Sequence, residues 1–206
     1  MNPVIGTLVF AGSVGIALLA GNLFFDRTGN FVWSRKLVHF LVGCVFLASP
    51  WLFSGNPHAP IAMSAFILLV FAITNKRELF YGVQRRTRYS EQAFAFSAMV
   101  CFISWYFVDP LVGTAAALFM AWGDGATGLA RWAISRAHVK GWEGTATNLV
   151  VCSLIALLVE PYWVGLAGAV VFTIAEHLCG DVGKIKWLDD NLGAPMAALV
   201  VMGVLL

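Results

Sequence analysis

The chain of 206 residues is 60% hydrophobic and only 12% charged, with a mean hydropathy of +0.81. Soluble domains usually have about 25% charged residues, so this composition excludes an ordinary soluble protein and indicates a polytopic membrane protein. The formal net charge of +2 is too small to indicate a nucleic-acid partner. We expect one transmembrane domain over residues 1–206.

Eight apolar segments follow one another along the chain, and each predicts a helix. Several are shorter than the ~20 residues of a full span, so either flanking polar residues extend them or one or two are re-entrant. We therefore expect an all-α bundle of about seven or eight transmembrane helices. The segments are roughly Pro3–Phe25, Leu37–Phe53, Pro60–Thr74, Ala93–Val108, Leu111–Trp122, Thr145–Val159, Tyr162–Ala175 and Leu192–Leu206.

Basic residues are confined to alternate connections between these segments. All 13 Lys and Arg residues fall in the first, third, fifth and seventh connections, and none in the others. The positive-inside rule assigns such connections to the cytoplasm. We therefore expect an integral membrane protein whose termini are both extracytoplasmic if it has eight spans. Because most acidic residues share the basic side, we also expect the active site on the cytoplasmic face.

A cationic motif, Arg35-Lys36-Leu-Val-His39, opens the second segment. Its three polar residues are three or four positions apart, so they can share one face of a helix. That face would attract a phosphate group, and the imidazole could donate or relay a proton. The alternative interpretation is a topogenic anchor followed by a buried structural histidine.

An acid between two glycines, Gly123-Asp124-Gly125, ends the fifth apolar segment. The glycines allow a sharp turn that exposes backbone amides at the membrane edge. If the chain continues as a helix after Asp124, its first amides would attract an anion. Asp124 could instead merely cap that helix.

Further acidic residues lie near the same predicted face. Lys140-Gly-Trp-Glu143-Gly144 precedes the sixth segment, and Glu176 ends the seventh. Asp189 and Asp190 stand side by side before Asn191, and adjacent carboxylates repel each other unless a cation lies between them. This pair predicts a Mg²⁺ site. Asn191 could also act only as a helix cap, and Glu143 could only complement a helix dipole.

Four motifs in this order resemble the polyprenol kinase family, which comprises dolichol kinase, phytol kinase and the CTP-dependent diacylglycerol kinases. They are Arg35-Lys-x-x-His39, Trp122-Gly-Asp-Gly-x-x-Gly128, Lys140-x-Trp-Glu-Gly-Thr145 and Asp189-Asp-Asn-Leu-x-x-Pro195. The resemblance implies phosphoryl transfer from CTP, usually with a divalent metal, to the hydroxyl of a membrane-resident alcohol. The size and the Asp-Asp-Asn motif are more similar to phytol kinase than to dolichol kinase.

On this hypothesis, the acceptor is phytol, farnesol, geranylgeraniol, a polyprenol or diacylglycerol, and ATP could replace CTP. The base could be Asp124, His39 or Glu176, and oligomerisation remains open. The expected catalytic residues are Asp124, Lys140 and His39, the expected metal ligands Asp124, Asp189 and Asp190, and the expected nucleotide-binding residues Arg35, Lys36, Gly123, Gly125, Glu143, Gly144, Asn191 and Glu176.

Two other functions compete with this one. A CTP:phosphatidate cytidylyltransferase-like enzyme would also join a cytidine nucleotide to a membrane lipid, but it would release pyrophosphate. A small transporter is disfavoured, because its ionisable groups should lie near the membrane midplane. Here they collect at one face, and no internal repeat is evident.

Overall fold

The computed structural model describes residues 3–74, 77, 79–84, 89–134, 141–179, 185 and 188–206, which form an all-α bundle as predicted. A short 3₁₀ helix, η2 (Ser104–Tyr106), follows α4, and a π-helical segment, η3 (Phe119–Gly123), joins α5 to α6. The helices are α1 (Pro3–Thr28), α2 (Phe31–Phe53), α3 (His58–Thr74), α4 (Ser90–Ile103), α5 (Pro110–Leu118), α6 (Asp124–Ile134), α7 (Trp142–Ala156), α8 (Tyr162–Leu178) and α9 (Asp190–Leu205).

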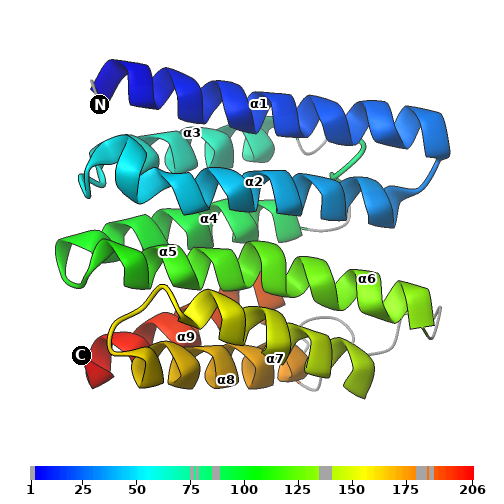
Figure 1. The fold of residues 1–206 in the computed structure, drawn as a ribbon. Coiled ribbons are helices and arrows are strands. Elements are labelled where there is room, and N and C mark those ends of the chain that lie inside the picture. Colours follow the sequence, from blue (N-terminus) through cyan, green and yellow to red (C-terminus); the bar gives the residue numbers. More distant parts are fainter. Residues whose placement is uncertain are drawn as a thin grey trace.

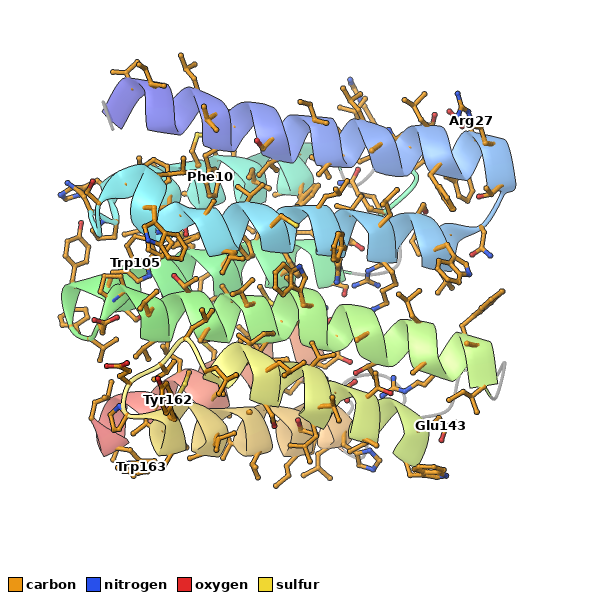
Figure 2. All side chains as sticks on the ribbon, viewed as in Figure 1. Phe10, Arg27, Trp105, Glu143, Tyr162 and Trp163 are labelled. Atoms are coloured by element: carbon orange, nitrogen blue, oxygen red, sulfur yellow. The ribbon has the colours of Figure 1, made fainter. Side chains whose placement is uncertain are left out.

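The helices lie side by side along one axis and alternate in direction, with α5 and α6 forming a single long rod (Figure 1). The start of α1 and the end of α9 lie at the same end of the bundle (Figure 1). Figure 2 shows Arg27 and Glu143 at the opposite end, whereas Trp105, Tyr162 and Trp163 lie near the end that holds the termini. Successive connections therefore lie at alternate ends of the bundle, as the placement of the basic residues predicts. The compartment that each end faces remains a prediction.

The first two helices are longer than the sequence predicted. The connection between them is reduced to Gly29, whose φ of 65° is left-handed, and Asn30, whose side chain accepts a hydrogen bond from the Trp33 amide. Such a cap can start a helix before the apolar run begins. As a result, Arg35 and Lys36 lie inside α2, at its second turn, and not in a connection.

The prediction of a sharp turn at Gly123–Gly125 is wrong. The rod runs without a break from Pro110 to Ile134 and passes through these glycines. A Cβ at Gly123 would lie 2.7 Å from the Cys152 sulfur on α7, so this glycine provides close packing and not a turn. The predicted anion-binding helix start at Asp124 is therefore absent. The π-helical segment, a feature often found at functional sites, lies immediately before the acid.

The centre of the bundle is the first half of the rod. Every residue from Ala115 to Ala121 is fully buried, because α5 is surrounded by α2, α4, α7, α8 and α9. Alanines let neighbouring helix backbones come close, as in helix packing within membranes. Asp124 thus lies directly after this buried stretch, where the rod reaches the charged end of the bundle.

The outer surface of the bundle is also apolar. Large hydrophobic side chains that are more than half exposed occur on several helices, among them Leu8, Ile16, Phe66, Ile73, Leu154 and Val200. A helix that is apolar on both its inner and outer faces is typical of a membrane span. Within the described residues, Val4–Thr28 and Phe31–Phe53 are long and apolar enough to cross a membrane, and His58–Thr74, Tyr162–Leu178 and Asp190–Leu205 are shorter apolar helices.

Close contact between α4 and α5 depends on Gly113. A Cβ at this position would overlap with the Cys101 carbonyl oxygen, which belongs to the backbone and cannot rotate away. We expect Gly113→Ala to reduce the free energy of unfolding by about 1–3 kcal/mol, as overpacked cores do. Thermal unfolding in detergent measures this effect.

Gly12→Ala is the matched control, because a Cβ there would meet nothing within 4 Å. In a helix this change should be neutral or stabilising by up to about 1 kcal/mol. Equal stability of the two variants would contradict the close packing of α4 on α5.

Candidate functional site

Three predicted residues meet at the charged end in a group that we call the Asp124 cluster, comprising Lys36, His39 and Asp124. The Lys36 Nζ donates to Asp124 Oδ2 over 2.8 Å and to the Asp124 backbone oxygen over 3.0 Å. The His39 Nδ1 lies 3.2 Å from the same Oδ2. The side chains of Lys36, His39 and Asp124 are only 10%, 7% and 18% exposed. Charges this sheltered are screened weakly, so their interaction is stronger than that of a surface pair.

Small residues on α6 make room for this cluster. A Cβ at Gly128 would overlap with the Lys36 side chain, so the lysine crosses the helix in the space that this glycine leaves. A Cβ at Gly125 would lie 3.9 Å from the His39 Cβ, which is an ordinary contact, so the packing would also accept a side chain at this position. The glycine that the local packing requires is therefore Gly128, which the resemblance included in its motif without assigning it a role.

A second group, which we call the Ser90 cluster, comprises Arg35, Ser90 and Asn191. Arg35 Nη2 and Asn191 Nδ2 both donate to the Ser90 hydroxyl, the latter over 2.7 Å. One hydroxyl thus joins α2, α4 and α9, whose residues are distant in the sequence. Arg35 Nε and Asn191 Oδ1 are buried and have no hydrogen-bond partner within the described part of the chain. Buried polar atoms are normally satisfied, so these two atoms are available to a ligand.

The two predicted metal-binding residues before Asn191 begin α9. The Asp189 side chain caps this helix by accepting from the Asn191 amide over 2.9 Å. Burial raises the pKa of Asp189 above its ordinary value, and the neighbouring carboxylate of Asp190 raises this pKa further. Arg35 and the hydrogen bonds from Asn191 act in the opposite direction. The structure therefore brings Asp189 near the Ser90 cluster, where burial and the neighbouring carboxylate disfavour its charged form.

Glu176 lies elsewhere, in a pair with Arg131. The Arg131 Nη2 donates to Glu176 Oε1 over 3.1 Å and to Oε2 over 3.3 Å, which ties α6 to α8. Glu176 is only 1% exposed. A Cβ at Gly144 would lie 2.6 Å from Arg131 Nε, so this glycine gives the arginine its space. The geometry favours a structural role for Glu176 over that of a base.

Beneath this pair, a chain of buried hydrogen bonds joins three helices. Asn148 Nδ2 donates to Thr127 Oγ1 over 2.9 Å, and Thr173 Oγ1 donates to Asn148 Oδ1 over 2.8 Å. Thr127 Oγ1 in turn donates to the Gly123 backbone oxygen over 2.9 Å. The chain holds α6 against α7 and α8 just behind Asp124.

Two of the remaining predicted residues, Lys140 and Glu143, belong to the third motif, which leads into α7. Lys140 lies outside the described residues. Glu143 lies in the first turn of α7, at the charged end of the bundle (Figure 2). Within the residues that the structure describes, no three His, Cys, Asp or Glu side chains come together closely enough to hold a metal ion.

Sequence reasoning missed Ser90 and Asn148. Ser90 belongs to the polar triplet Ser90-Glu-Gln that starts α4, and it was assigned to the basic connection before it. Asn148 is a carboxamide inside an apolar segment, which is itself a signal, because polar groups within membrane helices need partners. Neither residue's partners could be identified before the helices were placed.

Cations and acids from separate helices thus meet at one end of the bundle. A comparison with curated proteins supports a relationship to the polyprenol kinase family. The chain is 26% identical over 180 residues to the phytol kinase of Synechocystis sp., a match that covers 82% of this chain and 77% of the relative. The relationship to the polyprenol and phytol kinases is therefore supported over most of the chain. No protein-family model matches the chain, and no solved structure does.

The Ser90 hydroxyl can be tested through stability. Ser90→Ala would leave buried donors of Arg35 and Asn191 without their acceptor, which typically costs about 1–3 kcal/mol. We expect the free energy of unfolding in detergent to fall by that amount.

Ser97→Ala on the same helix provides the control. Its hydroxyl is buried without a hydrogen-bond partner among the described residues, so its removal should leave stability unchanged or raise it. A stable Ser90→Ala variant would mean that the Ser90 cluster does not connect the three helices.

Proposed function

We propose that this protein is an isoprenoid-alcohol kinase that transfers the γ-phosphoryl group of CTP to the hydroxyl of a membrane-resident alcohol. The similarity to phytol kinase supports an alcohol kinase in general. The observation that carries the proposal is the Asp124 cluster, in which a sheltered carboxylate holds both a lysine and a histidine. Phosphoryl transfer depends on positioning and charge neutralisation, and this cluster supplies groups for both.

The cations of α2 fit the demands of the nucleotide. Arg35 and Lys36 are adjacent in sequence, and each is held by a fixed partner, Ser90 or Asp124. Cations that are already oriented stabilise a developing phosphate charge without reorganising during the reaction. Lys140 retains its predicted role as a further cation, and Asn191 and Glu143 retain theirs in orienting the nucleotide.

His39 is the base that the contacts favour. Its Nδ1 faces Asp124, which orients the ring and stabilises the imidazolium that forms when the other nitrogen takes a proton. In the proposed step, the alcohol oxygen bonds to the γ-phosphorus while the bond from phosphorus to the β–γ bridging oxygen breaks. The hydroxyl proton passes to His39, and CDP leaves.

The residues present also fit a divalent cation such as Mg²⁺. This ion is usually held by one or two carboxylates together with substrate phosphates, and it needs no cage of three protein ligands. Suitable oxygen donors come from Asp189, Asp190 and Asn191, whose Oδ1 is buried and has no hydrogen-bond partner among the described residues. Asp124, the third predicted ligand, does not join them, because no three His, Cys, Asp or Glu side chains of the described residues come together closely enough to hold one ion. When bound, the cation would neutralise charge on the nucleotide phosphates.

We place the protein in a membrane with this end of the bundle in the cytoplasm. The apolar outer surface and the two long apolar helices support the first part. All 13 Lys and Arg residues fall in alternate connections or within two helical turns of them, which supports the second.

Substitution of the central carboxylate tests the mechanism. We expect Asp124→Asn to abolish CTP-dependent phosphorylation while leaving membrane insertion intact, because the amide can neither balance Lys36 nor stabilise a His39 imidazolium. The assay uses purified protein in lipid with labelled CTP. Asp109→Asn is the control, since this residue caps α5 at the other end and Asn caps a helix equally well. Wild-type activity of Asp124→Asn would remove the carboxylate from the mechanism.

The products distinguish the proposed reaction from its alternative. We expect labelled CTP, offered with phytol, farnesol, a long polyprenol or diacylglycerol, to yield a lipid monophosphate and CDP. Parallel reactions with ATP identify the donor. A CDP-lipid and pyrophosphate would instead identify a cytidylyltransferase.

Divalent-cation binding can be tested without catalysis. The repulsion between Asp189 and Asp190 should fall when a cation binds, so we expect Mg²⁺ with a non-hydrolysable CTP analogue to raise the unfolding temperature. This rise should be lost in Asp189→Asn. Asp26→Asn is the control, because Asp26 lies at the same end and, among the side chains that the structure describes, accepts from the Tyr81 hydroxyl alone. An equal rise in all three proteins would exclude Asp189 as a ligand.

A further inference from the structure

The central rod changes its winding directly before Asp124. The Asp124 amide donates to the carbonyls of Phe119 and Ala121, five and three residues earlier, whereas an α-helical amide donates to the residue four positions earlier. A segment whose hydrogen bonds reach back five residues winds less per residue than an α-helix does. The π-helical segment η3 therefore determines the side of the rod on which Asp124 lies. If η3 became α-helical, Asp124 would turn about the axis of the rod and away from α2.

The rod contacts different neighbours on two of its sides at this point. Asp124 faces α2, where its carboxylate and its backbone oxygen both accept from Lys36. One residue earlier, Gly123 faces α7, because a Cβ there would lie 2.7 Å from the Cys152 sulfur. Adjacent residues of a helix point about 100° apart. The contacts of Gly123 with α7 therefore fix the direction in which Asp124 points.

The hydrogen bonds behind Gly123 run in one direction. Thr173 Oγ1 donates to Asn148 Oδ1 over 2.8 Å, and Asn148 Nδ2 donates to Thr127 Oγ1 over 2.9 Å. Because a hydroxyl carries a single hydrogen, Thr127 accepts from the amide and directs its own hydrogen to a carbonyl. The Gly123 oxygen lies 2.9 Å away, and the Gly144 oxygen, at 3.4 Å, is the weaker acceptor. The carboxamide therefore sets which way the Thr127 hydroxyl points.

These polar side chains lie in otherwise apolar surroundings. Asn148 and Thr127 are fully buried, Thr173 is 4% exposed, and the next buried residues near the end of α7 are Ile155 and Ala156. A leucine would fill a volume similar to that of asparagine without burying polar atoms. Polar residues inside membrane helices are costly and usually functional. Control over the position of the nearby acid explains this network better than packing does.

We propose that Asn148 is a positioning residue for phosphoryl transfer, which acts through Thr127 to hold the π-helical segment so that Asp124 faces α2. The inference rests on the proposed kinase function and adds the device that directs its central carboxylate. Lys36 and His39 hold this carboxylate from the side of α2, whereas Asn148 holds the rod from the side of α7. Its substitution should therefore slow the chemical step without weakening nucleotide binding.

Matched substitutions separate positioning from stability. In the full chain in lipid nanodiscs, we expect Asn148→Leu and Thr127→Val to lower kcat by about 10–100-fold with little change in the KM for CTP, because a small misplacement of a reacting group has effects of this size. Thr127→Ser, which keeps the hydroxyl, should retain most of the activity. Thermal unfolding identifies any variant that does not fold, and each of the two network variants tests the same link.

Gly113→Ala is the control, because it disturbs the packing of α4 on α5 and leaves the hydrogen bonds of Asn148 in place. It should lower the unfolding temperature and preserve kcat in the folded protein. Wild-type kcat in folded Asn148→Leu and Thr127→Val would overturn the inference. A loss of kcat in folded Gly113→Ala as large as theirs would do the same, since the effect would then follow stability alone.

A spectroscopic measurement separates this inference from the kinase function. In protein with ¹⁵N-labelled histidine, the ring resonances of His39 report its contact with Asp124, and comparison with His39→Gln assigns them. We expect Asn148→Leu and Thr127→Val to move these resonances toward their positions in Asp124→Asn, and Gly113→Ala to leave them in place. Unmoved resonances in both network variants would overturn the inference even in an active kinase. If the wild type phosphorylates no alcohol, the expected movement would still support the positioning, and only the proposed function would fail.

Discussion

The contact between Lys36 and Asp124 is the interaction on which the charged end of the bundle depends. It ties α2 to the central rod, and the same carboxylate oxygen orients His39. Removing either charge would leave the other sheltered and uncompensated, which is far more costly than losing the pair as a whole. The contact therefore stabilises the helix packing, and in the proposed function it also holds the reactive groups in place.

Around this contact, the protein is organised in two halves that share one site. The helices α1 to α4 surround an apolar pocket, and α6 to α9 supply Arg131, Glu176 and the acids before Asn191. The largely buried α5 lies between the two halves, which the Ser90 cluster also joins directly. Such a division suits a reaction between a water-soluble nucleotide and a hydrocarbon alcohol, because each substrate can approach the Asp124 cluster from its own side.

Much of this arrangement could be predicted from sequence, because apolar runs and basic residues obey simple periodic rules. The runs located every α-helix of the described residues except α6, which lies in a stretch predicted as a connection. The placement of Lys and Arg indicated which connections share an end. Local patterns were weaker guides. Gly123-Asp-Gly125 suggested a turn, whereas the glycines accommodate neighbouring helices, and that need depends on tertiary packing. Ser90 gave little signal, since its role depends on Arg35 and Asn191, which are distant in the chain.

The unbroken rod through residues 119 to 134 also determines how an anion can be held at Asp124. In a glycine-rich phosphate loop, free backbone amides surround the anion, and they tolerate many side-chain substitutions. Here the backbone amides are hydrogen-bonded within the helix, so the negative charge of a bound anion must be neutralised by side-chain cations. A site built in this way is vulnerable to chemistry that a loop would survive: acetylation of a single lysine removes its charge, and no backbone donor can replace it.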